Sequence, residues 1–220
     1  METTIEVRRE LAKTGGYLTD KGLAWGSAGN LSAKTDDGQF LITASGTYLG
    51  ELSDRDFVEC PIHGDGANGS GKPSKEWPMH QAIYQERPEI SAVLHASPFY
   101  GTLAACSDLE VPSDLFVETM YELERVERVP YAHPGSMNLA EEVRKRAGKA
   151  NVLLLENHGV LVYDKSIKEA RTAIEVLEMA CRMIVTASQS GVTLKRLSSE
   201  VVRSFLEDSG YKPRRRWQDS

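Results

Sequence analysis

The hydrophobic positions in the first half of the chain change from helical to strand-like spacing. Apolar residues recur on a charged background between residues 5 and 22, which predicts an opening helix. Short apolar runs bounded by Gly, Asp or Ser follow, and they predict an antiparallel meander of strands over residues 30–33, 40–44 and 57–61. A second helix is expected over residues 74–87, with the serine at its start as N-cap.

The second half of the chain contains the longer apolar segments. Residues 90–94 and 151–155 are too short and too apolar for surface helices, so both are predicted as buried strands, with 159–163 returning beside the second. Helices are expected over residues 137–148 and 167–189. Strands and helices mixed in this order predict an α/β fold, and the lack of repeated strand-helix-strand units argues against a Rossmann sheet.

No internal repeat or low-complexity linker interrupts this pattern. We therefore predict a single domain over residues 1–220, with a core over about residues 5–190 and a C-terminal helix and basic tail over 198–220. The basic run over residues 212–217 is expected to be solvated; the alternative is that it lies over a site and attracts a phosphorylated substrate.

Composition and charge narrow the functional classes. The 220 residues carry a formal net charge of -6 and are 40% hydrophobic, which indicates an acidic globular protein and argues against a nucleic-acid partner. The longest uncharged stretch, residues 90–107, is broken by polar residues, proline and glycine, so no membrane span is expected. We see no apolar leader. The three cysteines are odd in number and lack CxxC spacing, which is typical of reduced thiols, so a cytoplasmic location is predicted.

Two histidines and one glutamate are the strongest candidates for chemistry. His95 and His158 each follow a predicted strand, where they are either structural or aimed into a cleft as ligands of a zinc-like ion. Glu76 lies in the first turn of the second predicted helix. It is either a charge favoured by the positive end of the helix dipole, behind Ser74 as N-cap, or an acid/base group beside a metal. Glycine- and hydroxyl-rich turns near residues 26–30 and 45–47 are candidates for binding a phosphate.

Six segments taken together resemble the class II aldolase/adducin family, over nearly the whole chain from about Leu18 to Ile184. In order, they read GSAGNLS, ITASGT, GKPSKEWPMH, AVLHASPFY, VPYAHPGS and ENHGVLVY. The resemblance implies a three-layer α/β/α sandwich around a central, mostly antiparallel sheet. It also implies a homotetramer with active sites between subunits.

The resemblance further implies roles for particular residues. Glu76 matches the family's acid/base glutamate, and His95 and His158 match two of its metal-binding histidines. The positions that match the family's phosphate-binding residues are Ser27, Gly29, Asn30, Ser45, Gly46, Ser74 and Lys75, the last in place of a second serine.

The chain also departs from the family pattern. Ser97 stands where the second histidine of an HxH motif is usual, and serine is a poor zinc ligand. His133 is an extra histidine that either compensates or contacts the substrate. Phe116 stands where the fuculose-type aldolases carry a tyrosine that donates a proton to the site of a neighbouring subunit, and phenylalanine cannot donate a proton. Tyr121 is close by in the sequence, without evidence that it substitutes.

The function that the resemblance implies is that of a metal-dependent aldolase, which cleaves a small sugar phosphate through an enediolate. The expected cofactor is a divalent ion, zinc first, with manganese, cobalt or iron as alternatives. Because one histidine and one tyrosine are missing, decarboxylation, dehydration and epimerisation on the same scaffold are alternatives. A metal-free, adducin-like binding module is the alternative from another functional class.

Overall fold

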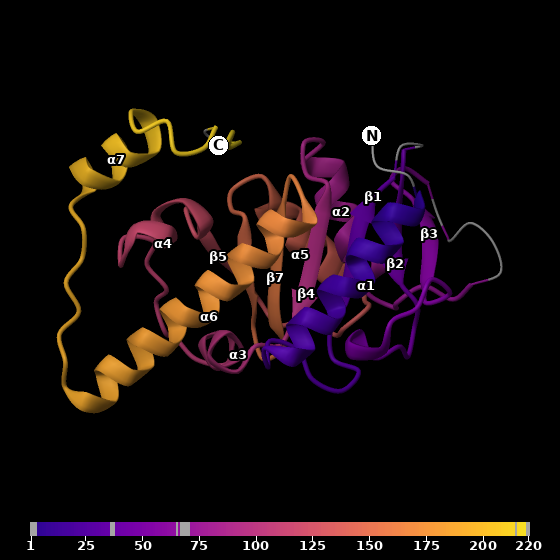
Figure 1. Cartoon of the computed structure of the whole chain (residues 1–220), viewed down its shortest axis with the longest axis horizontal. Coiled ribbons are helices and arrows are strands. Elements are labelled where there is room, and N and C mark those ends of the chain that lie inside the picture. The colour runs from indigo at the N-terminus through magenta and orange to yellow at the C-terminus, as the bar shows by residue number, and fades with distance from the viewer. Residues whose placement is uncertain (1–3, 36–37, 65, 67–70, 214, 219–220) are drawn as a thin grey trace.

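The computed structural model describes residues 4–35, 38–64, 66, 71–213 and 215–218. These residues contain a seven-stranded sheet with the strand order β3-β2-β1-β4-β7-β6-β5 (Figure 1). The described strands are β1 (Asn30–Lys34), β2 (Gln39–Thr43), β3 (Phe57–Pro61), β4 (Ala92–Ala96), β5 (Val126–Val129), β6 (Val152–Leu155) and β7 (Gly159–Asp164). Among them only β5 and β6 pair in parallel, so the sheet is mixed.

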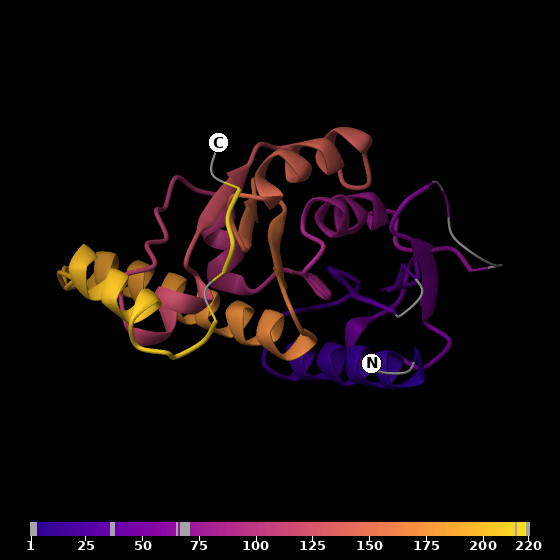
Figure 2. The same cartoon turned by 90° about the horizontal axis from the view of Figure 1, so that it is seen from above.

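Helices cover both faces of the sheet, because each face is apolar (Figure 2). One buried cluster joins the sheet to α1, α3 and α6, and the other joins it to α2 and α5. The described helices are α1 (Thr4–Asp20), the 3-10 helix η1 (Leu49–Glu51), α2 (Trp77–Glu86), α3 (Phe99–Ala105), α4 (Val117–Glu122), α5 (Met137–Ala147), α6 (Ile167–Ser190) and α7 (Ser199–Glu207). No helix within these described ranges is long and apolar enough to cross a membrane.

The α/β prediction is confirmed, and the first three strands form the expected antiparallel meander. The expectation of a mostly antiparallel sheet is met in part, since β5 pairs in parallel with β6. Two of the differences between predicted and observed boundaries affect the site. The strand expected over residues 90–94 runs two residues later, because Ala92–Ala96 pair with β7; His95 therefore lies within a strand rather than after it.

The second helix also begins later than predicted. Residues 74–76 form a turn in which the amide of Trp77 donates to the carbonyl oxygen of Ser74 at 3.1 Å. Glu76 is consequently the N-cap residue of α2, and its side chain makes no capping hydrogen bond. The carboxylate therefore lies at the positive end of α2, as the alternative explanation from the helix dipole expects, without capping the helix itself.

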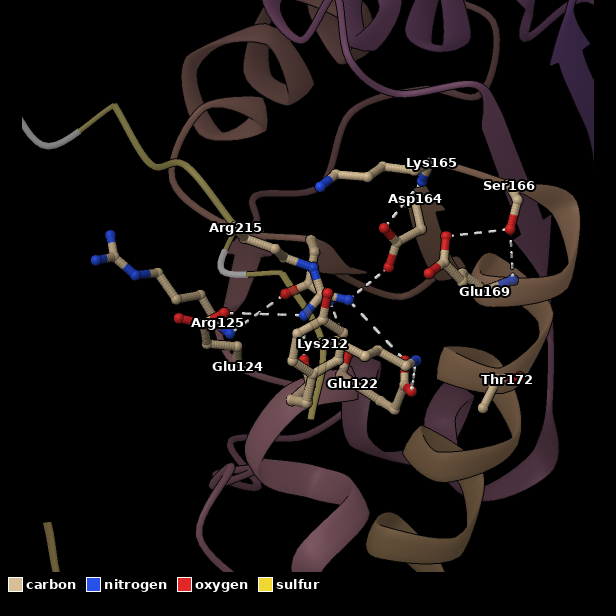
Figure 3. A network of polar contacts seen from close by, with 12 residues as sticks. Glu122, Glu124, Arg125, Asp164, Lys165, Ser166, Glu169, Thr172, Lys212 and Arg215 are labelled. Atoms are coloured by element: carbon tan, nitrogen blue, oxygen red, sulfur yellow. Dashed lines mark hydrogen bonds and ion pairs between the residues drawn. The ribbon is translucent and has the colours of Figure 1, made fainter. Parts of the chain in front are cut away.

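The C-terminal tail is packed against the body rather than solvated, which corrects the expectation for the basic run (Figure 3). Arg215 is buried, pairs with Asp164 Oδ2, donates to the carbonyl oxygen of Tyr121 and lies 4.1 Å from the centre of that ring. Lys212 pairs with the buried carboxylate of Glu122 at 2.6 Å. Arg214 lies outside the described residues. The tail therefore joins β7 to α4 through buried ion pairs.

This packing predicts that Arg215→Met destabilises the protein. The substitution keeps an apolar stem but leaves Asp164 buried without its cation, which typically costs about 3–5 kcal/mol. Urea unfolding followed by circular dichroism measures the loss. Arg216→Met is the matched control, because Arg216 is exposed, and its effect should stay within about 0.5 kcal/mol. Equal stability of the two variants would contradict a stabilising role for the Arg215 network.

Candidate active site

Four inner strands of the sheet have an end on the same side, and the segments next to these ends surround a cavity of about 450 Å³. β1 starts there and β4 ends there, since Asn30 pairs with His95, while β2 ends and β7 starts beside them. Antiparallel pairing therefore brings together segments that are far apart in the sequence. The cavity is lined by Trp25, Ser27, Ala28, Gly29, Asn30, Ala44, Ser45, Gly46, Thr47, Ser74, Lys75, Glu76, His95, Ser97, Pro134 and His158.

Glu76, His95 and His158 form a compact cluster on the wall of this cavity. Their ligand atoms all lie within 4.8 Å of one another. His158 Nε2 is 3.3 Å from Glu76 Oε1, and His95 Nε2 is 3.5 Å from Glu76 Oε2. His95 Nδ1 lies 2.9 Å from the carbonyl oxygen of Val160, so Nδ1 carries the proton and Nε2 keeps a lone pair. Two imidazoles and one carboxylate thus face a common point.

Burial keeps the His158 ring in the form that binds a cation. Burial, together with a smaller effect of the neighbouring His95, lowers the pKa of His158 to about 4 against the opposing effect of Glu76. At neutral pH the ring is therefore uncharged, with a lone pair to offer. Glu76 Oε1 and His158 Nδ1 are buried, and within the described structure neither has a hydrogen-bond partner.

Two glycines allow the backbone to close around the cluster. A Cβ on Gly29 would lie 2.6 Å from the carbonyl oxygen of His95, and Gly29 has a φ of +95°, which other residues rarely adopt. A Cβ on Gly159 would lie 2.8 Å from the carbonyl oxygen of Ala96. Both segments can therefore approach β4 closely only because they carry glycine there.

The seven residues predicted to bind phosphate all line the same cavity as the cluster. Two of their amides have other partners: Ser45 donates to the carbonyl oxygen of Lys72 at 2.9 Å, and Ser74 to that of Thr43 at 3.0 Å. An anion near these two residues would therefore meet their hydroxyl groups and the Lys75 ammonium rather than these amides. The assignment to phosphate stays a prediction.

The residues that depart from the family pattern fall into two groups. Ser97 is buried and lines the cavity, whereas His133 is exposed, contacts the Tyr131 hydroxyl at 3.1 Å and stays outside both the cavity lining and the cluster. Phe116 packs against the apolar cluster under α6, and the Tyr121 hydroxyl donates to the carbonyl oxygen of Pro213. Neither of these two aromatic residues lines the cavity within this chain.

The hydrogen bonds that join Glu76 to His80 through Asn30 were not predicted from the sequence. Asn30 Nδ2 donates to Glu76 Oε2 at 2.8 Å, and Asn30 Oδ1 contacts His80 Nε2 at 2.6 Å. Burial, with a smaller effect from His95, lowers the pKa of His80 well below its ordinary value. The signal in the sequence was the spacing of four residues between Glu76 and His80, which puts both on the same side of α2.

Comparison with known proteins gives a consistent result. Residues 9–185 match the model for the class II aldolase and adducin N-terminal domain. A 3-oxo-tetronate 4-phosphate decarboxylase of Pectobacterium atrosepticum is 36% identical over 181 residues, 80% of this chain and 83% of that protein. An L-fuculose phosphate aldolase of Methanocaldococcus jannaschii is 33% identical over 176 residues, 80% of this chain and 94% of that protein.

Solved structures agree with the sequence matches. The structure of YgbL from Klebsiella pneumoniae superposes with a TM-score of 0.86 at 31% identity, covering 93% of this chain and 100% of that one. An L-fuculose 1-phosphate aldolase structure superposes with a TM-score of 0.81 at 29% identity, covering 93% of this chain and 96% of the other. The chain therefore belongs to the class II aldolase/adducin family.

Proposed function

We propose that the chain is a metal-dependent decarboxylase of a phosphorylated 3-oxo sugar acid. The observation that carries this proposal is the Glu76, His95 and His158 cluster on the wall of a cavity that also contains the hydroxyl groups and lysine expected for a phosphate. The substrate class is taken from relatives named 3-oxo-tetronate 4-phosphate decarboxylase, which are 32% to 36% identical to this chain.

The donor set fits a divalent transition-metal ion. Neutral imidazole nitrogens and a carboxylate oxygen are the ligands that zinc and its neighbours prefer, and the unpartnered buried oxygen of Glu76 faces His158. We propose that His95 and His158 hold the ion, with Ser97 near by. When bound, such an ion would draw electron density from a substrate carbonyl and stabilise an enediolate.

The side chains of the cavity would transfer the proton and bind the phosphate. Loss of CO2 from a 2-hydroxy-3-oxo acid breaks the bond between C1 and C2 and leaves the electron pair in an enediolate. Glu76 would take up a proton from solvent water and deliver it to C2, which completes the hydroxyketone phosphate. Ser27, Ser45, Ser74 and Lys75 would hold the phosphate and orient the substrate.

Aldol cleavage is the second candidate, because fuculose phosphate aldolases are also similar to this chain. The two reactions differ in the group that leaves. An aldehyde leaves only after a hydroxyl proton has been removed, whereas an ionised carboxylate leaves as CO2 with no proton to remove. Phe116 stands where the family's proton-donating tyrosine is expected, and phenylalanine cannot donate a proton from this subunit or from a neighbouring one. The Tyr121 hydroxyl already donates to the carbonyl oxygen of Pro213. We therefore rank decarboxylation first.

Several finer properties stay predictions of the family resemblance. They are zinc as the ion, a homotetramer with sites between subunits, and a cytoplasmic location. A metal-free binding module of the adducin type is disfavoured, because such a module has no use for three converging ligands in a cavity.

The first prediction concerns the substrate. The metal-loaded protein should release CO2 from 3-oxo-tetronate 4-phosphate, with a turnover of about 1 per second or more. Coupled assays for CO2 and for the triose phosphate product measure this rate, and L-fuculose 1-phosphate serves as the comparison. Cleavage of the fuculose phosphate alone would favour the aldolase. A metal-loaded protein that is inactive on both compounds would contradict both candidates.

A second prediction concerns the ion. His158→Ala removes one of the two histidines proposed to hold the ion, so metal affinity should fall by more than about 100-fold, with a parallel loss of activity. Elemental mass spectrometry after equilibrium dialysis measures the metal per chain. His133→Ala is the matched control, because His133 lies outside the cluster and should retain the ion. Full metal retention in His158→Ala would remove that residue from the site.

The third prediction concerns proton transfer. Glu76→Gln preserves size and one acceptor oxygen but cannot carry a proton, so kcat should fall by roughly 100- to 10,000-fold. Steady-state kinetics on metal-loaded protein measures the change, with metal content determined on the same sample. A kcat within a few-fold of the wild type would exclude Glu76 as the acid/base group.

A further inference from the structure

A line of buried hydrogen bonds runs from the cluster into the protein behind it. It joins Glu76 to Asn30, Asn30 to His80, His80 to Ser32 and Ser32 to Tyr84, with distances between 2.6 and 2.8 Å. All of these residues are buried. They come from β1 and from α2 with its N-cap residue, and the reaction proposed above uses only Glu76 among them.

Chemistry fixes the direction of every bond in this line. The ionised Glu76 carboxylate only accepts, so the Asn30 amide places its NH2 toward Glu76 and its carbonyl oxygen toward His80. Since that oxygen also only accepts, His80 Nε2 must carry a hydrogen. A buried, neutral His80 has one ring proton, so its Nδ1 accepts from the Ser32 hydroxyl, which in turn accepts from Tyr84.

All four bonds therefore donate toward the carboxylate. Bonds aligned in this way polarise one another, which strengthens the last of them, from Asn30 to Glu76. Reversing the line would require the Asn30 amide to rotate by half a turn and the His80 proton to move to Nδ1. Either change alone would leave two acceptors facing each other, and the rotated Asn30 oxygen would face the ionised carboxylate even if the rest of the line changed with it.

We propose that His80 is a positioning residue that holds Glu76 for proton transfer by locking the Asn30 amide. With Oε2 fixed by Asn30, Oε1 is left as the oxygen that carries the proton. Oε1 is buried, has no hydrogen-bond partner in the described structure and lies 3.3 Å from His158 Nε2. This inference rests on the proposed role of Glu76 and extends it to a residue that does not line the cavity.

Kinetics of two substitutions separates positioning from packing. His80→Leu removes the donor to Asn30, so kcat should fall about 10- to 100-fold while KM changes less than about threefold. His80→Gln keeps an NH2 donor near the position of Nε2 and should recover most of that loss. Met79→Ala is the matched control: the neighbouring Met79 is equally buried in the apolar cluster under α2, so it should lower stability but leave kcat within about twofold.

A second measurement does not depend on activity. In protein labelled with nitrogen-15 at histidine, the His80 signals, assigned through bonds to its Cβ, should show the hydrogen on Nε2 and a bare Nδ1. This tautomer should persist with and without added zinc. A hydrogen on Nδ1 would overturn the proposal, and this result needs only the wild-type protein, so it stands even if His80→Leu does not fold.

The outcomes distinguish this inference from the proposed function. If the wild type turns over neither substrate, the proposed function fails, while the tautomer still tests the direction of the hydrogen bonds. If the wild type is active but His80→Leu and His80→Gln have the same kcat, or if His80→Leu changes only KM, the positioning role is wrong. Tyr84→Phe should reduce kcat by a smaller factor than His80→Leu, since it removes only the most distant donor.

Discussion

The antiparallel pairing of β1 with β4 is the constraint on which the site depends. It sets Asn30 opposite His95, with Ser32 two residues further along β1 and Ser97 directly after the end of β4. A shift of one residue would turn Asn30 and His95 to the other face and separate them from Glu76. The close approach requires Gly29, whose missing side chain makes room for the His95 carbonyl group. The strand register therefore determines the chemistry of the cavity.

The core of the site could be predicted from the sequence because its residues lie in short motifs at the ends of elements. Glu76, His95 and His158 were each candidates, and the family resemblance placed them in one site before their distances were known. His80 was not recognised, because its partner Asn30 is 50 residues away and only the folded sheet brings the two together. Spacing along one chain cannot show that a polar side chain bridges two elements.

Two further differences from the predicted structure have physical causes: some elements are too short to show a pattern, and one contact joins residues far apart in the sequence. The helices α3 and α4 and the strand β5 are short, so they contain too few turns or alternations for a pattern to be visible. The basic tail was expected to be solvated, which is the usual state of a run of charges. Arg215 is instead buried, because Asp164, 51 residues earlier, supplies the opposite charge. Long-range ion pairs of this type leave no local trace.

The cluster of candidate metal ligands would serve either of two reactions, and the other side chains near the cavity decide between them. Decarboxylation and aldol cleavage both place an electron pair on a carbon next to a carbonyl group, and the same two histidines and glutamate would serve either one. What differs is the leaving group, and hence the need for a second proton-transfer residue. In this chain Phe116 has no proton to donate, the Tyr121 hydroxyl donates to the carbonyl oxygen of Pro213, and His133 contacts Tyr131 at the surface. A cavity with one carboxylate and no tyrosine of its own suits a leaving group that departs without a proton.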